Sequence, residues 1–250
     1  HCGMTAPDAV SATPTPPAPP VDAAGRDGFW KAWLVYLQPR ALVAMFLGFS
    51  SGLPLALSGS TLLVWVSESG VSLGTIGLFT LVGTPYTLKF LWAPLVDGLR
   101  IPLLSRWLGR RRGWLVFTQL LLMAAILALA LTDPARSPFF VALGALLVAT
   151  ASATQDIVVD AFRVESLDES EQAAGMASYV AAYRIGMVAS TAGALFLVTG
   201  FEHLGLPRLH AWMASLAVMA GLVVIGIVTV LLAREPDGST RTEAATGDKP

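Results

Sequence analysis

Four charged residues lie within hydrophobic segments of this sequence: Lys89, Asp156, Asp160 and Arg184. An ionised group at the centre of a bilayer costs about 2.5 to 3.5 kcal/mol on insertion scales, so such residues usually face a protein interior or a water-filled cavity. From their depths we expect Lys89, Asp156 and Arg184 to form an ion-paired group. A carboxylate beside cations can carry a proton or act as a fixed counter-ion, and buried pairs can equally serve only to hold helices together.

Further polar residues share helical faces with these charges. Asp156, Asp160 and Arg163 recur at i, i+4 and i+7 and therefore lie on one face, although Asp160 and Arg163 are near enough to the interface to brace a loop instead. Pro54 interrupts the first hydrophobic segment, either as a simple kink or as a broken-helix site. We predict a pathway for a substrate or for protons that uses Lys89, Asp156, Asp160, Arg184, Gln155, Tyr183, Ser58 and Thr61.

A second group of charges forms a loop between two hydrophobic segments. The loop follows Asp97, contains Arg100 and Arg106, and ends in the run Gly109, Arg110, Arg111 and Arg112. Loops rich in Lys and Arg stay on the cytoplasmic side of a membrane. An aspartate at a helix end beside these arginines suits an ion-paired gate, so we predict that Asp97, Gly109, Arg110, Arg111 and Arg112 form a gating motif.

The composition identifies the elements that position these residues. Of 250 residues, 54% are hydrophobic and only 13% are charged, and the mean hydropathy is +0.65, which indicates an integral membrane protein. Three histidines and one cysteine provide no metal-ligand cluster. We therefore expect no enzymatic activity, no catalytic residues, no metal, no cofactor and no nucleic-acid partner.

Six hydrophobic segments are long enough to span a bilayer about 30 Å thick. We predict spans at 41–65, 73–95, 114–132, 138–160, 174–199 and 209–232. Residues 1–40 are predicted to be a disordered tail with an interfacial lead-in, and 233–250 a second disordered tail. With twelve Lys and Arg on the side of the 2–3 loop and two on the other, both termini are predicted to be cytoplasmic.

The two triplets of spans have a cation in corresponding helices. Lys89 lies in span 2 and Arg184 in span 5, which matches a three-plus-three inverted repeat. The predicted fold is an all-α membrane protein with six transmembrane helices in this arrangement, half of a major facilitator fold.

Several segments resemble a known family. They are GFSSGLPLALSGSTLLVWV (48–66), GVSLGTIGLFTLVGTPYTLKFLWAPLVD (70–97), LGRRRGW (108–114), ATQDIVVDAFRVE (153–165) and AAYRIGM (181–187). Together they are similar to the AmpG-type muropeptide permeases of the major facilitator superfamily, over residues 41 to 200. The run from Asp97 to Arg111 is similar to the superfamily's 2–3 loop motif, with Ala93 in place of its first glycine and a longer insert.

The resemblance implies an N-terminal six-helix half of a proton-coupled importer of anhydromuropeptides, GlcNAc-anhydroMurNAc peptides used in cell-wall recycling. The implied location is the bacterial inner membrane. The implied partners are the muropeptide, protons, the lipid bilayer, and a second six-helix half, which is either a C-terminal half or a second copy. The alternatives are transport of another anionic solute such as acetyl-CoA, and a non-transporting scaffold.

Overall fold

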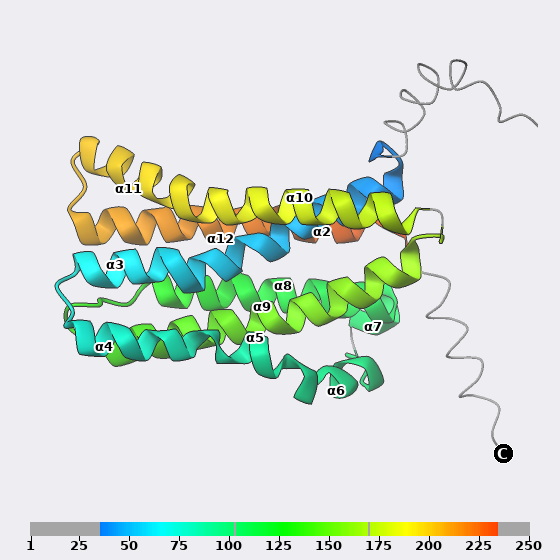
Figure 1. Cartoon of the computed structure of the whole chain (residues 1–250), viewed down its shortest axis with the longest axis horizontal. Helices are drawn as coiled ribbons and strands as arrows, with labels where there is room; N and C mark the ends of the chain where they lie inside the picture. Colours follow the sequence, from blue (N-terminus) through cyan, green and yellow to red (C-terminus); the bar gives the residue numbers. More distant parts are fainter. Residues whose placement is uncertain (1–35, 103, 170, 235–250) are drawn as a thin grey trace, which may run out of the picture. The chain divides into compact units, whose positions relative to one another are not determined.

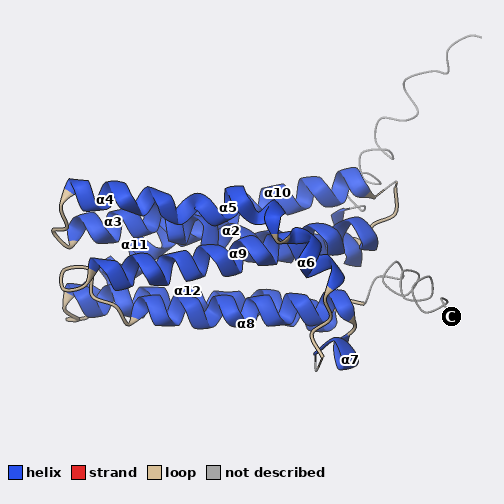
Figure 2. Cartoon of the chain, turned by 90° about the horizontal axis from the view of Figure 1, so that it is seen from below, coloured by secondary structure: helices blue, strands red, loops and turns tan. Residues whose placement is uncertain are grey.

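The computed structural model describes residues 36–102, 104–169 and 171–234, which all belong to one compact unit, Val35–Pro250. Within these residues the regular structure is entirely helical (Figure 2), which confirms the predicted all-α class. The predicted disordered tails, 1–40 and 233–250, lie outside the described residues except for 36–40 and 233–234.

Five of the six predicted spans are helices long and apolar enough to cross a membrane. Span 1 consists of α2 (Pro39–Ala56), the π-helical η1 (Leu57–Thr61) and α3 (Leu62–Glu68). Spans 3, 4 and 6 are α8 (Arg110–Ala130), α9 (Pro138–Ser166) and α12 (Arg208–Leu232). Span 5 consists of α10 (Gln172–Val188), the π-helical η4 (Ala189–Gly193) and α11 (Ala194–His203). The chain is therefore a multi-pass membrane protein.

Span 2 is not the single continuous helix predicted for 73–95. It is a series of short helices, α4 (Leu73–Leu78), η2 (Phe79–Gly83), α5 (Thr84–Leu88), η3 (Lys89–Leu91) and α6 (Ala93–Gly98). Pro85 and Pro94 each lie in the first turn of a new helix, where the missing N–H is tolerated, whereas in a helix interior it would cost a hydrogen bond. The two prolines therefore explain two of the breaks. A further short helix, α7 (Leu104–Leu108), lies in the 2–3 loop.

The packing of the spans follows a two-fold exchange. Span 1 packs on span 5 through α2 and α10, and span 4 packs on span 2 through α9 and the short helices (Figure 1). Span 3 packs on span 4, span 6 packs on span 1, and spans 3 and 6 pack on each other. When spans 1, 2 and 3 are exchanged with spans 4, 5 and 6, the pair of spans 1 and 5 becomes the pair of spans 4 and 2. The pair of spans 3 and 4 becomes the pair of spans 6 and 1. These pairs are related as in an inverted repeat, whereas the packing of span 6 on span 5, through α12 and α11, has no comparable counterpart between the described residues of spans 3 and 2.

Glycines allow the closest approach in the bundle, between α2 and α10. A side chain at Gly48 or Gly52 would overlap the backbone carbonyl of Tyr179 or Tyr183, and one at Gly186 would overlap the carbonyl of Phe49. Small residues at this spacing bring two helix backbones together. The α2–α10 pair is therefore a tightly packed unit on which the polar side chains of spans 1 and 5 are mounted.

Both ends of the described chain lie at the same end of the bundle as the 2–3 loop, which we call the loop end. Arg40, at the start of α2, pairs with Asp168 of the 4–5 loop at 2.6 Å, and Arg112, at the start of α8, donates to the carbonyl oxygens of Val230 and Leu231 at the end of α12. Eight described arginines belong to this end and two, Arg136 and Arg208, to the opposite end. The eight are Arg40, Arg100, Arg106, Arg110, Arg111, Arg112, Arg163 and Arg234.

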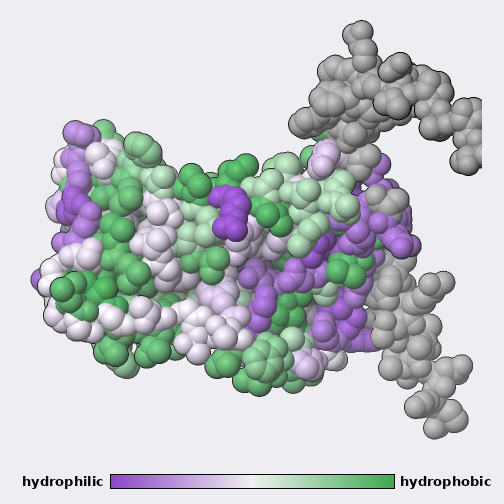
Figure 3. Space-filling model, viewed as in Figure 1, coloured by the Kyte–Doolittle hydropathy of each residue, from purple (hydrophilic) through white to green (hydrophobic). Residues whose placement is uncertain are grey.

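The surface of the bundle is largely apolar, as a lipid environment requires. Spans 3 and 6 expose residues such as Phe117, Leu121, Val224 and Val228. On the face shown in Figure 3, hydrophilic residues gather at both ends of the bundle and in a small group at mid-bundle that is surrounded by hydrophobic ones. The bundle thus has lipid-compatible sides and one side with embedded polar groups.

Candidate functional site

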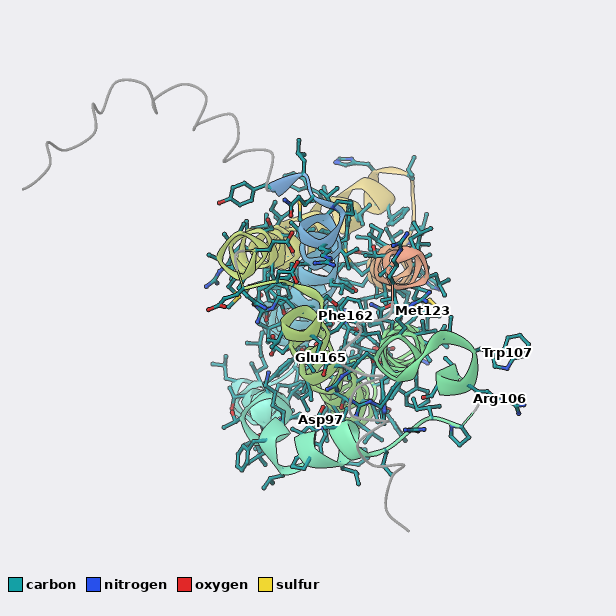
Figure 4. The ribbon with its side chains drawn as sticks, turned by 90° about the vertical axis from the view of Figure 1, so that its right-hand side faces the viewer. Asp97, Arg106, Trp107, Met123, Phe162 and Glu165 are labelled. Carbon is teal, nitrogen blue, oxygen red and sulfur yellow. The ribbon has the colours of Figure 1, made fainter. Side chains whose placement is uncertain are left out.

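The 2–3 loop and the ends of three spans form one ion cluster. The Arg111 guanidinium lies 2.6 Å from Oδ1 of Asp97, at the end of α6, and 2.6 Å from Oε1 of Glu165, at the end of α9. The side chain of Arg111 is only 7% exposed, so the two carboxylates neutralise a nearly buried cation. In Figure 4, Asp97 and Glu165 lie within the loop end of the bundle, whereas Arg106 and Trp107 point away from it.

Each of the three successive arginines binds a different element. Arg110 donates to the backbone carbonyl of Asp97, Arg111 binds the two carboxylates, and Arg112 donates to α12 at 3.0 and 2.8 Å. Successive residues of a helix point about 100° apart, so one helical turn can contact three neighbours. Gly109 precedes them with φ +89°, a conformation that favours glycine, and this turns the loop into α8. The predicted motif residues are therefore brought together.

The carboxylates also offset an unfavourable electrostatic interaction at the start of α8. Cations in the first turn of a helix face the positive end of its dipole, which is unfavourable. Arg112 avoids this cost by reaching the carbonyls at the C-terminal end of α12, where a cation is favourable. Arg111 requires the carboxylates of Asp97 and Glu165. Sequence reasoning missed Glu165, which lies 54 positions from Arg111, although it closes one of the quoted family segments.

A polar core surrounds Asp156 at the middle of the bundle. Gln155 is fully buried, and its amide nitrogen lies 3.5 Å from Oγ of Ser50 and 3.4 Å from Oγ of Ser51. Asp156 is 7% exposed. Its Oδ1 atom has no hydrogen-bond partner among the described residues, although the carboxyl group interacts with the Ser51 hydroxyl, and the Tyr86 hydroxyl with those of Ser58 and Ser152. The core therefore holds a buried carboxyl group surrounded by hydroxyl and amide groups.

The predicted ion-paired group of Lys89, Asp156 and Arg184 is not formed. No carboxylate of the described residues lies within ion-pair distance of Lys89 or Arg184. Arg184 is exposed because Tyr179, Ala182 and Gly186 form the buried face of α10, and residue 184 lies about 200° around the helix from Ala182. We call this exposed side of α10, which carries Arg184, the open face.

Lys89 and Asp160 lie around the buried Asp156. Lys89 is half-buried in η3 and, with Asp160, lies within electrostatic range of Asp156. The side chain of Asp160 is 49% exposed and pairs with Arg163 at 3.4 Å. Arg163 in turn lies over the ring of Tyr179, 5.3 Å from its centroid. Of these two carboxylates, Asp156 is thus buried and Asp160 is accessible.

Spans 1 and 5 are joined by polar contacts at their π-helical segments. Thr61 Oγ1 donates to the carbonyl of Ser190 at 2.9 Å, and the hydroxyls of Ser60 and Thr191 lie 3.2 Å apart. Ser58 donates to the carbonyl of Pro54 at 2.9 Å. π-Helical turns inside longer helices are frequent at functional sites. The predicted Thr61 therefore belongs to this junction, whereas Ser58 bonds within its own span. Tyr183 packs 5.9 Å from Tyr179, measured between ring centroids.

A hollow of about 140 Å³ separates the π-helical part of span 1 from span 2. Its lining includes Ser58, Gly59, Thr80, Gly83 and Tyr86. Ser58 thus lies on the side of span 1 that faces span 2. Among the described residues, no group of three or more His, Cys, Asp or Glu side chains could hold a metal ion.

These features define the class of protein: an all-α, multi-pass membrane protein with the fold expected for half of a major facilitator protein, a polar core and an arginine-rich 2–3 loop. Comparison with known proteins finds relatives of this kind. The chain is 42% identical over 202 residues to the anhydromuropeptide permease of Escherichia coli K12, covering 81% of this chain and 39% of that protein. It is 34% identical over 205 residues to the putative transporter AmpG 4 of Rickettsia conorii, covering 81% and 47%.

The chain is a homologue of the AmpG-type permeases, as the resemblance of its segments predicted. A family model described as acetyl-coenzyme A transporter 1 matches residues 40–139. The chain spans about two fifths of the length of the E. coli relative.

Proposed function

We propose that this chain forms half of a proton-coupled transporter that imports anhydromuropeptides across the bacterial inner membrane for cell-wall recycling. The observation that carries the proposal is the 42% identity to an anhydromuropeptide permease over four fifths of the chain. A second six-helix half, either a C-terminal half or a second copy, completes the path. The excess of arginines at the loop end supports a cytoplasmic location for this end and for both termini.

In this proposal the open face binds the substrate. A muropeptide combines sugar rings with peptide carboxylates, and Arg184 is an exposed cation without an ion-pair partner in the part of the chain that the structure describes. A guanidinium can bind a carboxylate through two parallel hydrogen bonds. Tyr183, the half-buried neighbour of Arg184 in the sequence, provides aromatic surface. Lys89 supplies a second positive charge on the side of span 2.

Asp156 is the proposed proton carrier. It is buried, it lacks an ion pair within the described residues, and Lys89 and Asp160 lie nearby. A buried carboxylate without a charged partner pays a large desolvation cost when it ionises. It can therefore exchange its proton only when water reaches it from one side. Alternating access would let Asp156 load a proton from the periplasm and release it to the cytoplasm.

The 2–3 loop is the proposed gate. Rocking of one half against the other requires contacts that break and form again, and the cluster of Asp97, Arg110 and Arg111 is an exchangeable ion-paired contact at a helix end.

Replacing Asp156 with asparagine tests the proton role. In proteoliposomes we expect Asp156→Asn to abolish gradient-driven accumulation of labelled anhydromuropeptide while counterflow without a gradient continues, because the neutral side chain still fits the core. Asp160→Asn is measured in parallel, and Asp133→Asn, in the loop at the opposite end, is the matched control. Intact accumulation in both the Asp156 and the Asp160 variants would refute a proton role for either residue.

The same assay separates the alternative functions. The match of residues 40–139 to the acetyl-coenzyme A transporter family favours acetyl-CoA as the second candidate. Uptake of labelled acetyl-CoA without uptake of anhydromuropeptide would replace the proposed substrate. Exchange of neither compound by a stably inserted protein would favour the scaffold.

A further inference from the structure

A second ion cluster lies at the opposite end of the bundle. Arg208, the first residue of α12, lies 2.7 Å from Oε2 of Glu68 and 2.8 Å from Oε1 of Glu202. Glu68 is the last residue of α3, and Glu202 is the next-to-last residue of α11. Trp212, one turn after Arg208, donates from Nε1 to the same Oε2 of Glu68 at 3.1 Å. One arginine thus joins the ends of spans 1 and 5 to the start of span 6.

This cluster is the counterpart of the loop-end cluster under the exchange of the two triplets. At the loop end, an arginine at the start of span 3 joins carboxylates at the ends of spans 2 and 4. When spans 1, 2 and 3 are exchanged with spans 4, 5 and 6, the start of span 3 corresponds to the start of span 6. The ends of spans 2 and 4 correspond to the ends of spans 5 and 1. Arg208, Glu202 and Glu68 occupy these places.

The approach to each arginine repeats as well. Gly109, two residues before Arg111, has φ +89°, and Gly205, three residues before Arg208, has φ +91°. Both loops therefore enter their helix through a conformation that favours glycine. A tryptophan follows each arginine by about one turn, and each indole N–H bonds to the end of a preceding helix or its loop: Trp114 to the carbonyl of Leu99, and Trp212 to Glu68. The correspondence thus covers the backbone, the charges and the aromatic residue.

We propose that Glu68, Glu202 and Arg208 are positioning residues that set the opposite end of this half for closure, as the Arg111 cluster does for the loop end. The proposal rests on the transport function proposed above. Spans 1 and 5 carry the junction of Ser60 and Thr191, and the Arg208 cluster holds the ends of these two spans beside span 6. If each cluster favours closure of its own end, then loss of one cluster shifts the protein toward opening at that end and closure at the other.

The two clusters differ in strength because they differ in burial. The side chain of Arg111 is 7% exposed, whereas that of Arg208 is 51% exposed. We expect loss of the Arg208 cluster to change the balance of access states by about 5-fold, which corresponds to about 1 kcal/mol, the upper range for exposed ion pairs.

Cysteine alkylation at two sites can measure this balance. In a background in which Cys2 is replaced by serine, one reporter is Ser60→Cys, in η1 of span 1. The other is Ala177→Cys, on the open face toward the loop end, seven residues and about two turns from Arg184. A membrane-impermeant maleimide is applied to oriented vesicles from either side. The variants are Arg208→Gln, Arg208→Lys as the conservative form, Glu202→Gln, and Arg111→Gln.

We expect Arg208→Gln to raise labelling of Ser60→Cys by about 5-fold and to lower labelling of Ala177→Cys, with Arg111→Gln acting in the reverse sense. Glu202→Gln should produce a smaller shift in the same direction as Arg208→Gln. It replaces Arg208→Gln as the test if the arginine variant does not insert into the membrane. Arg208→Lys should restore the parent pattern. Arg136→Gln, an exposed arginine at the same end, is the matched control and should change neither site.

A rise at Ser60→Cys without a fall at Ala177→Cys would indicate local loosening only and would overturn the proposal. Labelling of Arg208→Gln that equals that of Arg136→Gln would also overturn it. No substrate is present in this assay. Reciprocal labelling in a protein that fails to take up anhydromuropeptide would therefore refute the proposed substrate and leave the positioning role intact.

Discussion

Of the two carboxylates that bind Arg111, Glu165 is expected to contribute more to stability than Asp97. It accepts three hydrogen bonds from the guanidinium, at 2.6, 3.1 and 3.2 Å, and its side chain is 23% exposed. Asp97 accepts one at 2.6 Å with a side chain that is 49% exposed. Glu165→Gln keeps the size of the side chain but removes the charge, and among the described residues it leaves Asp97 as the carboxylate that pairs with the nearly buried Arg111.

The cost can be estimated from these contacts. Hydrogen bonds to charged groups contribute about 1.5 to 3 kcal/mol, so we expect Glu165→Gln to lower the free energy of unfolding by about 2 kcal/mol. Asp97→Asn should cost about 1 kcal/mol, because that carboxylate is half exposed and makes one bond with Arg111. At about 2 to 4 °C per kcal/mol for a chain of this size, the Tm values should fall by about 4 to 8 °C and 2 to 4 °C.

Thermal unfolding of the detergent-solubilised protein, followed by fluorescence-detected size exclusion, measures the two shifts. Asp168→Asn is the matched control, because Asp168 pairs with Arg40 at the same end at 2.6 Å but its side chain is 73% exposed. Its Tm should fall by less than about 2 °C. A shift for Glu165→Gln no larger than that for Asp168→Asn would refute the argument that the buried guanidinium depends on Glu165.

Two further predictions concern packing and topology. Gly52→Ala should lower the Tm by several degrees, because its new methyl group would overlap the backbone carbonyl of Tyr183 and overpacking costs about 1 to 3 kcal/mol. Gly59→Ala is the control, because nothing lies within 4 Å of the added carbon. Equal Tm values for the two variants would contradict the close α2–α10 contact. Cysteines at Ser105 and Ser137 should label from opposite sides of the membrane, with Ser105 cytoplasmic, and labelling of both from the periplasm would rule out the topology.

Hydrophobic segments and their flanking charges were sufficient to predict the all-α class, five long apolar helices and the end at which the arginines gather. The break in span 2 was readable in principle, because Pro85 and Pro94 cannot both lie inside one regular helix. The prediction of a continuous helix was wrong because hydropathy reports composition and length, and says nothing of backbone hydrogen bonds. The close approach of α2 and α10 depends on glycines whose spacing alone is weak evidence.

The candidate site shows a different limit. Sequence depth placed Lys89 and Asp156 at similar levels of the membrane and Arg184 deeper, but an ion pair also depends on the direction in which each side chain points. Arg184 is exposed because the opposite face of α10, which carries Gly186, packs on α2. Glu165 was missed for the converse reason: its partner Arg111 lies in another span, and only the packing of α8 on α9 brings the two together.

Backbone continuity and side-chain burial both indicate that the contact of Arg111 with Asp97 is the weaker one in the loop-end cluster. Glu165 lies on α9 with Asp156, and that helix is uninterrupted from Pro138 to Ser166, so these two carboxylates keep a fixed separation. Asp97 is joined to Lys89 through η3 and the break at Trp92, and such element ends are where hinge motion is absorbed.

The Arg111–Asp97 contact is also the more exposed of the two, and it has fewer hydrogen bonds. If the 2–3 loop gates transport as proposed, the contact that breaks is therefore Arg111 with Asp97. The pair of Arg111 and Glu165 then stays closed, and span 2 moves relative to the fixed unit of spans 3 and 4.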